Sequence, residues 1–349
     1  MIDARQRAAL VAVSCALVLC ACGAGAAEPK SSQPAAPPEP VSQAAGTGNI
    51  PRPVFDSARA WADLQKQVAF GPRPAGSQAL AACRTYILSE LAAAGIETRQ
   101  QVFDADTPLG TTRMVNLIAT IPGQRPERII LATHYDTKLF RDIRFVGASD
   151  GASSTAAVLE LARALKGRRN QFTIELLFLD GEEAVVEWAG NDHTYGSRHY
   201  VSAAQRDGTL STAKALVLLD MIGDRDLDIR RDANSTPWLV DVVWAAAERL
   251  GHRSTFVNEL TTIEDDHVPF VRAGVPSVDI IDLNYAQWHT QQDDLDHVSA
   301  DSGESTEPNF TLGNPEIRRT SASRRSVSSL RTAADWMMAS FFASDRSIR

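Results

Sequence analysis

The hydrophobic positions of this chain follow two different periods along its length. Residues 57–70 and 79–94 carry Leu, Val, Ala and aromatic side chains at intervals of three to four, a spacing that predicts two helices. The run Gly71-Pro72-Arg73-Pro74 between them predicts a break in the helical backbone. The folded part of the chain is therefore expected to begin with a pair of helices.

Beyond this pair the pattern changes to short runs that are apolar at nearly every position. Runs of strand length that are rich in Leu and β-branched residues are typical of strands buried on both faces, and they cover residues 115–121, 129–133, 172–179, 215–219 and 278–281. Helical spacing returns between them, at residues 153–165, 197–205 and 238–250. This alternation predicts an α/β fold, a three-layer α/β/α sandwich around a central, mostly parallel mixed sheet. A chain of 349 residues fits one such domain, at 54–349, with appendages.

The amino-terminal segment predicts export. Arg5 and Arg7 precede an apolar stretch at residues 8–21, as in the charged and apolar regions of a signal peptide. The stretch is too short to span a membrane well, and it ends in Leu19-Cys20-Ala21-Cys22, which resembles a bacterial lipoprotein box with Cys22 as the lipidated residue. Plain cleavage after a small residue at 24–27 is the alternative. We expect a signal peptide at 1–22, a flexible tether at 23–53, and a periplasmic or membrane-anchored lipoprotein of a bacterium.

Composition limits which partners the protein is expected to bind and what can stabilise its fold. The net charge is −8, and no basic stripe exists for a nucleic-acid backbone, so we expect a monomer without nucleic acid, and membrane contact only through a lipid. Only Cys83 lies in the folded part, where it fits core packing and cannot form an internal disulfide. The polar residues 300–326 predict an exposed insertion, and 330–342 predict a final amphipathic helix.

Acidic and imidazole groups follow the predicted strands at the point where each one ends. The runs in question are His134-Tyr135-Asp136, Asp180-Gly181-Glu182-Glu183, Asp220 and Trp288-His289, together with Asp150 in Gly147-Ala148-Ser149-Asp150-Gly151 at the start of a helix. Open α/β sheets place their sites at the carboxyl ends of parallel strands. Carboxylates that converge there need a cation, and nitrogen and oxygen ligands without thiolate suit a catalytic zinc with three protein ligands and one open position.

These residues also carry a resemblance to a known family. The chain resembles the M28 zinc peptidases over about residues 55–298 and the last helix, through the runs above, Leu219-Asp220-Met221-Ile222-Gly223 and His289-Thr290. Within that family it is most similar to the glutaminyl cyclases. The narrower marks are Trp188, Trp288 directly before His289, Tyr195-Gly196-Ser197-Arg198-His199 and Glu264-Asp265-Asp266-His267-Val268-Pro269-Phe270.

The resemblance implies a zinc exopeptidase-like fold and a defined set of roles. It implies one zinc per chain, held by Asp150, Glu183 and His289, with Glu182 as the proton shuttle. Asp220 and Asp265 would bind the leaving amide nitrogen, sharing a proton between them, and Trp188 and Trp288 would wall the glutamine side chain. The implied activity closes the amino-terminal glutamine of peptides or proteins into pyroglutamate and releases ammonia.

Two other functions stay open at this point. An M28 aminopeptidase would use two metals bridged by Asp150, with His134 and Asp220 on one and Glu183 and His289 on the other, and all five ligand types are present. A non-catalytic protein on the same fold would have lost ligands or the base, which this chain has kept. Simpler roles also remain for single residues. Asp220 could be a strand-end support, Trp188 a core residue, and His134 a supporting group oriented by Asp136.

Overall fold

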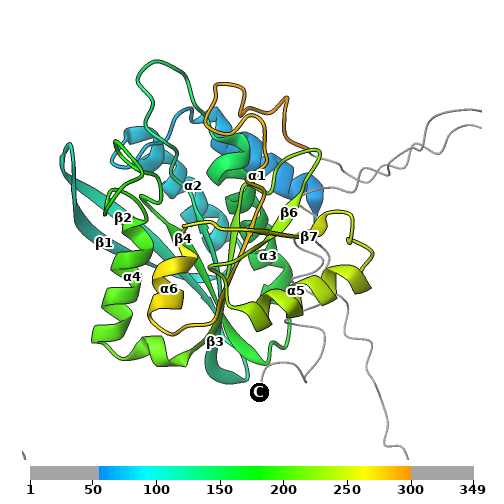
Figure 1. The fold of residues 1–349 in the computed structure, drawn as a ribbon. Coiled ribbons are helices and arrows are strands. Elements are labelled where there is room, and N and C mark those ends of the chain that lie inside the picture. The colour runs from blue at the N-terminus through cyan, green and yellow to red at the C-terminus, as the bar shows by residue number, and fades with distance from the viewer. Residues whose placement is uncertain (1–54, 300–349) are drawn as a thin grey trace, which may run out of the picture. The chain divides into compact units, whose positions relative to one another are not determined.

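The computed structural model describes residues 55–299, and a six-stranded sheet with the order β1-β2-β4-β3-β5-β8 lies at its centre (Figure 1). The strands are β1 Glu97–Thr107, β2 Gly110–Ile121, β3 Arg125–His134, β4 Phe172–Leu179, β5 Ala213–Asp220 and β8 Ser277–Ile281. The neighbouring strands β4, β3, β5 and β8 run parallel, whereas β1 and β2 form an antiparallel hairpin and β2 is antiparallel to β4. The expected mostly parallel mixed sheet is confirmed.

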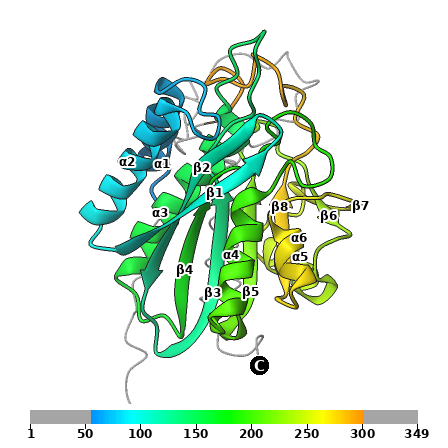
Figure 2. The ribbon, with the colours of Figure 1, turned by 90° about the vertical axis from the view of Figure 1, so that its left-hand side faces the viewer.

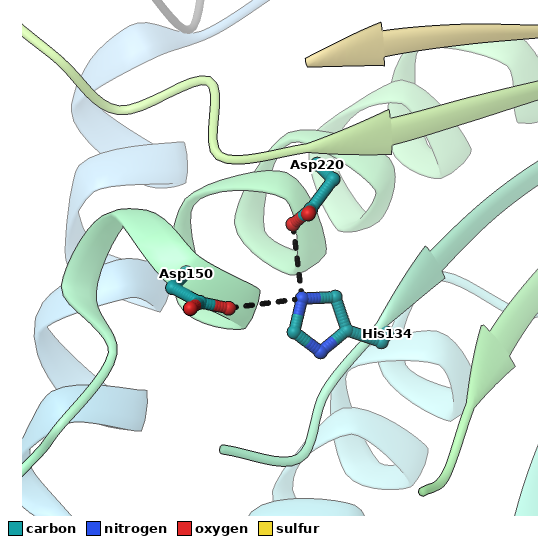
Figure 3. A group of neighbouring side chains, drawn as sticks. All are labelled: His134, Asp150 and Asp220. Atoms are coloured by element: carbon teal, nitrogen blue, oxygen red, sulfur yellow. Dashed lines mark hydrogen bonds and ion pairs between the residues drawn. The ribbon is translucent and has the colours of Figure 1, made fainter. Parts of the chain in front are cut away.

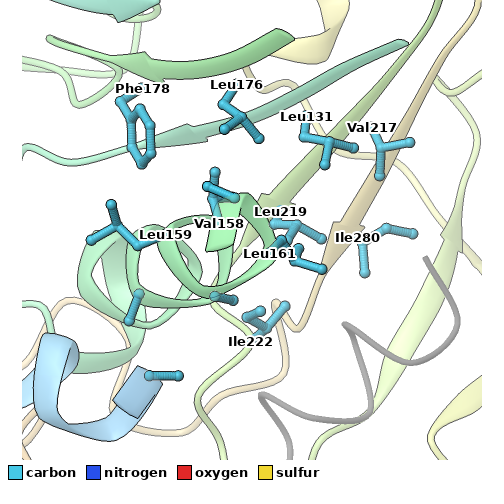
Figure 4. Packing of buried hydrophobic residues seen from close by; sticks show 14 of the residues in the cluster. Leu131, Val158, Leu159, Leu161, Leu176, Phe178, Val217, Leu219, Ile222 and Ile280 are labelled. Carbon is cyan, nitrogen blue, oxygen red and sulfur yellow. The ribbon is translucent and has the colours of Figure 1, made fainter. Parts of the chain in front are cut away.

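Helices cover both faces of this sheet, which gives the three predicted layers (Figure 2). On one face lie α1 Ser57–Ala69, α2 Gln78–Ala93, α3 Ser154–Lys166 and α5 Pro237–Arg249; on the other lie α4 Tyr195–Arg206 and α6 His267–Arg272. Alternation along β3 supplies both cores, since Leu131 packs in the first cluster and its neighbour Ile130 in the second. Figure 4 shows Leu131, Val217 and Ile280 from three adjacent strands packed around α3.

The first two helices begin where the sequence supplies a capping side chain. Asp56 accepts a hydrogen bond from the backbone N–H of Arg59 at 3.1 Å, and Ser77 accepts one from Leu80 at 3.0 Å. These bonds satisfy N–H groups that a first helical turn leaves without an intrahelical partner. Both helices start within one residue of their predicted positions.

Some elements do not follow the expected pattern. Strand β1 is mostly polar and exposed, because it lies at the edge of the sheet, and β2 begins five residues before its apolar run. A second, two-stranded parallel sheet, β6 Ile229–Asp232 and β7 Phe256–Thr261, and the short helix α6 were not predicted. Short elements of this kind carry too few residues to show a period.

Some of the remaining sequence predictions concern residues 55–299, and others do not. Cys83 is buried in the first core cluster, which confirms its packing role. Among residues 55–299, none of the helices has the length and apolar character to cross a bilayer. The signal peptide, the tether, the insertion and the final helix all lie outside the described residues.

The core predicts a clear difference between two leucines. Leu131 is fully buried, and replacing it with Ala should lower the free energy of unfolding by about 2–5 kcal/mol, because the lost contacts leave a cavity. Leu260 is 73% exposed, and its change to Ala should alter that energy by about 0.5 kcal/mol or less. Urea unfolding of both variants measures the difference; equal losses would contradict the assigned core.

Candidate active site

The carboxyl ends of the parallel strands bring the predicted chemistry to one edge of the sheet. His134 is the last residue of β3 and Asp220 the last of β5, while Glu182 and Glu183 lie in the loop just after β4. Strands β4, β3 and β5 are neighbours, and the register pairs His134 with Leu179 at the end of β4. His289 comes from the loop after β8, the next strand along. The predicted clustering at strand ends is present.

Asp150 reaches this edge through an unusual turn between β3 and α3. Gly147 has φ 53°, and a Cβ placed there would lie 2.3 Å from the carbonyl oxygen of Asp150. Gly151 has φ 86°, and its Cβ would lie 2.7 Å from the carbonyl oxygen of Asp136. Only glycine fits both positions, because the backbone on either side of Asp150 passes too close to other atoms to leave room for a Cβ. The Asp150 side chain then lies against the strand ends, within 3.3 Å of His134.

Three side chains form the first candidate metal group: Asp150, Glu183 and His289. His289 Nε2 lies 3.3 Å from Glu183 Oε1 and 3.5 Å from Asp150 Oδ2. One potential ligand atom from each residue lies within 4.8 Å of the others. Two carboxylates and one imidazole are the donor types of a catalytic zinc centre, so the group fits a divalent metal.

The charges of this group also favour a cation. Burial, together with the Asp150 carboxylate, raises the pKa of Glu183 to about 7. The pKa of Asp150 is lowered, because hydrogen bonding and charge from His134 and the charge of His289 outweigh the opposing effect of burial. A divalent ion would hold both carboxylates in their ionised form, which metal binding requires.

A second group lies beside the first and shares Asp150 (Figure 3). His134 Nε2 lies 2.9 Å from Asp220 Oδ1 and 3.3 Å from Asp150 Oδ1. Burial opposes protonation of His134, but the charge of Asp220 and hydrogen bonds to neighbouring carboxylates raise its pKa well above the usual value. All five ligands of the two-metal alternative are therefore assembled at this edge of the sheet.

Asp136 supports the adjacent glutamates as well as His134. Its two carboxylate oxygens accept hydrogen bonds from the backbone N–H groups of Glu182, at 3.2 Å, and Glu183, at 3.3 Å. Its distance to His134 Nδ1 is 3.6 Å, an ion-pair distance. Asp136 therefore fixes the backbone from which both glutamates project.

The two glutamates have different partners. Glu183 contacts His289, whereas Glu182 Oε2 lies 3.8 Å from His134 Nδ1. Burial raises the pKa of Glu182 well above its usual value, and the Asp265 and Glu183 carboxylates add to this effect against the opposing charge of His134. A carboxyl group whose pKa is raised in this way holds a proton more readily than an ordinary glutamate, as a proton shuttle must.

Asp265 belongs to a buried acidic group that the sequence revealed only in part. Burial and the Asp220 carboxylate raise its pKa to about 6, consistent with the predicted pairing of these two residues. Behind it, His267 Nε2 lies 3.0 Å from Asp232 Oδ2, and His267 Nδ1 lies 3.6 Å from Asp279 Oδ2. Asp279 was not expected, although a carboxylate inside the apolar run 278–281 was the available signal.

The two tryptophans are exposed, each against an imidazole. Trp188 is 38% exposed and stacks on His193 with ring centroids 4.3 Å apart, so the alternative that Trp188 is a core residue is wrong. Trp288 is 43% exposed and stacks on His289 at 4.4 Å. Both indoles therefore offer surface to a ligand.

Further residues near His289 were missed. Phe140 and Phe145 meet its ring edge-on, at 5.5 and 5.7 Å between centroids. The buried Asp293 accepts hydrogen bonds from the backbone N–H groups of Ser149, at 2.7 Å, and Asp150, at 3.1 Å. Asp293 thus ties the loop that carries His289 to the loop that carries Asp150. Contacts between loops so far apart in the chain leave no local pattern.

The chain is similar in sequence and in structure to proteins named as glutaminyl cyclases. Glutaminyl-peptide cyclotransferase of Drosophila melanogaster is 29% identical over 261 residues, which cover 66% of this chain and 74% of that protein. A glutaminyl-peptide cyclotransferase-like protein of Mus musculus is 31% identical over 271 residues, 68% of this chain and 70% of that protein. The crystal structure of an Acidobacteriales bacterium glutaminyl cyclase has a TM-score of 0.74 and 36% identity, covering 86% of this chain and 98% of that one.

The chain also matches a whole protein family. Residues 116–310 match peptidase family M28, a span of more than half of the chain. The matched span contains the candidate ligands from strand ends β3, β4 and β5 and from the loop after β8. The chain belongs to peptidase family M28.

Proposed function

We propose that this protein is a glutaminyl-peptide cyclotransferase, which converts the amino-terminal glutamine of peptides or proteins to pyroglutamate with release of ammonia. The observation that carries the proposal is the Asp150, Glu183 and His289 group with Glu182 beside it, in a chain whose relatives are named glutaminyl cyclases. The N–Cδ bond of the lactam forms as the bond between Cδ and the amide nitrogen breaks. One proton passes from the α-amine to the leaving nitrogen.

Asp150, Glu183 and His289 would hold one zinc ion per chain. When bound there, zinc would polarise the γ-carbonyl of the glutamine side chain. The protein supplies the remaining requirements. Trp188 and Trp288 would wall the side chain and keep it curled toward the α-amine, which makes the attack intramolecular.

Glu182 would move the proton. It directly precedes the proposed ligand Glu183 in the chain, yet its side chain contacts His134 rather than His289. It would take a proton from the α-amine and give it to the departing ammonia, a role that its raised pKa supports. Asp220 and Asp265 would bind the leaving nitrogen, one donating and one accepting, since two close carboxylates favour holding one proton between them.

The alternative of a two-metal M28 aminopeptidase has less support. His134, Asp150 and Asp220 could hold a second ion, because His134 Nε2 lies within 3.3 Å of both carboxylates. The relatives compared above carry the cyclase name. A non-catalytic protein on this fold would be expected to lack a ligand or the base, and this chain keeps them all.

The cellular setting is proposed from sequence alone. Arg5, Arg7 and the apolar stretch 8–21 support export, and Leu19-Cys20-Ala21-Cys22 supports a lipid anchor on Cys22 of a bacterial lipoprotein. The enzyme would then act as a monomer outside the cytoplasm. Its substrates would be peptides or proteins in the same compartment.

The activity is tested with two substrates. Purified protein should release ammonia from a dipeptide that begins with glutamine, and it should cleave leucine p-nitroanilide at a far lower rate. A coupled ammonia assay and anilide absorbance measure the two reactions. Fast anilide cleavage without ammonia release would reject the cyclase in favour of the aminopeptidase.

The adjacent glutamates should differ in what they lose. Glu182→Gln should keep zinc and lose about 10²- to 10⁴-fold in turnover, because the proton acceptor is removed while shape is preserved. Glu183→Gln should weaken zinc binding, so that excess zinc partly restores its activity. Zinc content and turnover are measured with and without added zinc. A metal-free Glu182→Gln, or a fully loaded Glu183→Gln, would contradict the assigned roles.

Asp293 should matter for metal affinity without touching the metal. An Asn at this position has one acceptor oxygen for the two N–H groups of Ser149 and Asp150, so Asp150 should shift and zinc affinity should fall about 10- to 100-fold. The neighbouring Asp294→Asn is the control, because Asp294 bonds to His297 instead. Competition with a chromogenic chelator measures both affinities. Equal affinities in the two variants would show that Asp293 does not position Asp150.

A further inference from the structure

The loop between β4 and α4 is held in a fixed shape by one carboxylate. Asp192 accepts hydrogen bonds from three consecutive backbone N–H groups, those of Val185, Val186 and Glu187, at 2.8 to 3.0 Å. Its Oδ1 also accepts the Tyr195 hydroxyl hydrogen at 2.7 Å. The exposed stretch 186–191, which includes Trp188, is therefore closed at its base.

The returning end of this loop is tied directly to the glutamate segment. The backbone N–H of Thr194 donates to the carbonyl oxygen of Glu182 at 2.7 Å, and that of Tyr195 donates to Gly181 at 2.8 Å. Thr194 has φ 48°, a left-handed conformation that turns the chain into α4. The base of the loop and the proposed proton shuttle thus share one rigid backbone.

His193 lies at this base, under the indole of Trp188. It is only 6% exposed, and its carbonyl oxygen accepts a hydrogen bond from Arg198 at 2.8 Å. The imidazole Nδ1 lies 3.1 Å from the Thr194 hydroxyl. The rings of His193 and Trp188 are nearly parallel, 11° apart, with centroids separated by 4.3 Å. One indole face is therefore covered by a fixed ring, while 38% of Trp188 stays exposed.

The contact is a stack of two neutral rings. Burial lowers the pKa of His193, and the positive charges of Arg198 and Arg272 add to this effect against the carboxylates of Glu264 and Asp192. The imidazole is therefore uncharged at neutral pH, and its stacking does not depend on a titration in that range. Offset stacking of two flat rings restricts the tilt of each.

We infer that His193 is a positioning residue for the substrate site, which fixes the indole of Trp188 so that its free face forms one wall of the glutamine subsite. The inference rests on the proposed function, because Trp188 is the wall in that proposal. The other wall, Trp288, rests on His289, a proposed metal ligand, and cannot be tested without disturbing the metal. His193 belongs to none of the candidate metal groups of residues 55–299, so its effect on the wall can be isolated.

The inference predicts a change in substrate affinity rather than in the chemical step. His193→Ala should raise KM by about 3- to 10-fold, the worth of one aromatic stack, and leave kcat within about twofold. His193→Phe keeps a flat ring in place and should restore KM. His199→Ala is the matched control, because His199 also stacks on an aromatic ring, that of Phe103 at 4.2 Å, and should leave KM unchanged.

A double-mutant cycle assigns the effect to Trp188. In a Trp188→Ala background, His193→Ala should add nothing further to KM. An unchanged KM in the single variant, or a full additional rise in the Trp188→Ala background, would overturn the inference. If His193→Ala fails to fold, His193→Phe decides: a folded variant with KM near wild type supports stacking, and one with a raised KM rejects it.

Near-UV circular dichroism separates this inference from the proposed activity. The signal assigned to Trp188, obtained by subtracting the Trp188→Phe spectrum, should be lost in a His193→Ala background and kept in a His193→Phe background. The full chain is used throughout. A wild-type protein without ammonia release would reject the proposed function while this spectrum still tests the stack. A Trp188 signal that is unaffected by His193→Ala would reject the positioning role itself.

Discussion

Burial of negative charge at the carboxyl edge of the parallel sheet is the constraint on which this site depends. Asp150, Glu183, Glu182 and Asp265 are all nearly inaccessible to water, and isolated carboxylates are costly to bury. Burial and neighbouring carboxylates raise the pKa of Glu183 to about 7 and that of Asp265 to about 6. Such a site gains stability by taking up a cation or by holding protons, and the proposed cyclase uses both.

The rest of the fold offsets the cost of burying these charges. Two apolar layers on the faces of the sheet hold the strand ends in register, so the acidic groups meet without a disulfide in the described residues. Asp136 and Asp293 then fix backbone N–H groups of the loops that carry the candidate ligands. The hydrogen bonds that these two carboxylates accept offset part of the cost of burying them. Negative charge is thus used to position other negative charge.

The sequence was most informative where local pattern and burial coincide. The strand at 172–179 is found with the predicted ends, because a run buried on both faces is apolar at almost every position. The clustering of acidic and imidazole groups followed from strand ends that meet in space, whereas the choice of Asp150, Glu183 and His289 as one ligand set came from the family resemblance. Strand β1 was missed because an edge strand with polar residues lacks that signal. Asp293, Phe140 and the stacking of His193 on Trp188 depend on how loops fold back, which no period in the chain encodes.

The central claim is that one metal ion, held by Asp150, Glu183 and His289, serves this site while His134 and Asp220 remain bonded to each other. Anomalous diffraction at the zinc absorption edge, from crystals of the zinc-loaded protein, measures both the number and the position of the ions. The account predicts a single peak within coordination distance of those three residues, with His134 Nε2 still close to Asp220 Oδ1, as at 2.9 Å here. A second peak of similar height between His134 and Asp220 would contradict it.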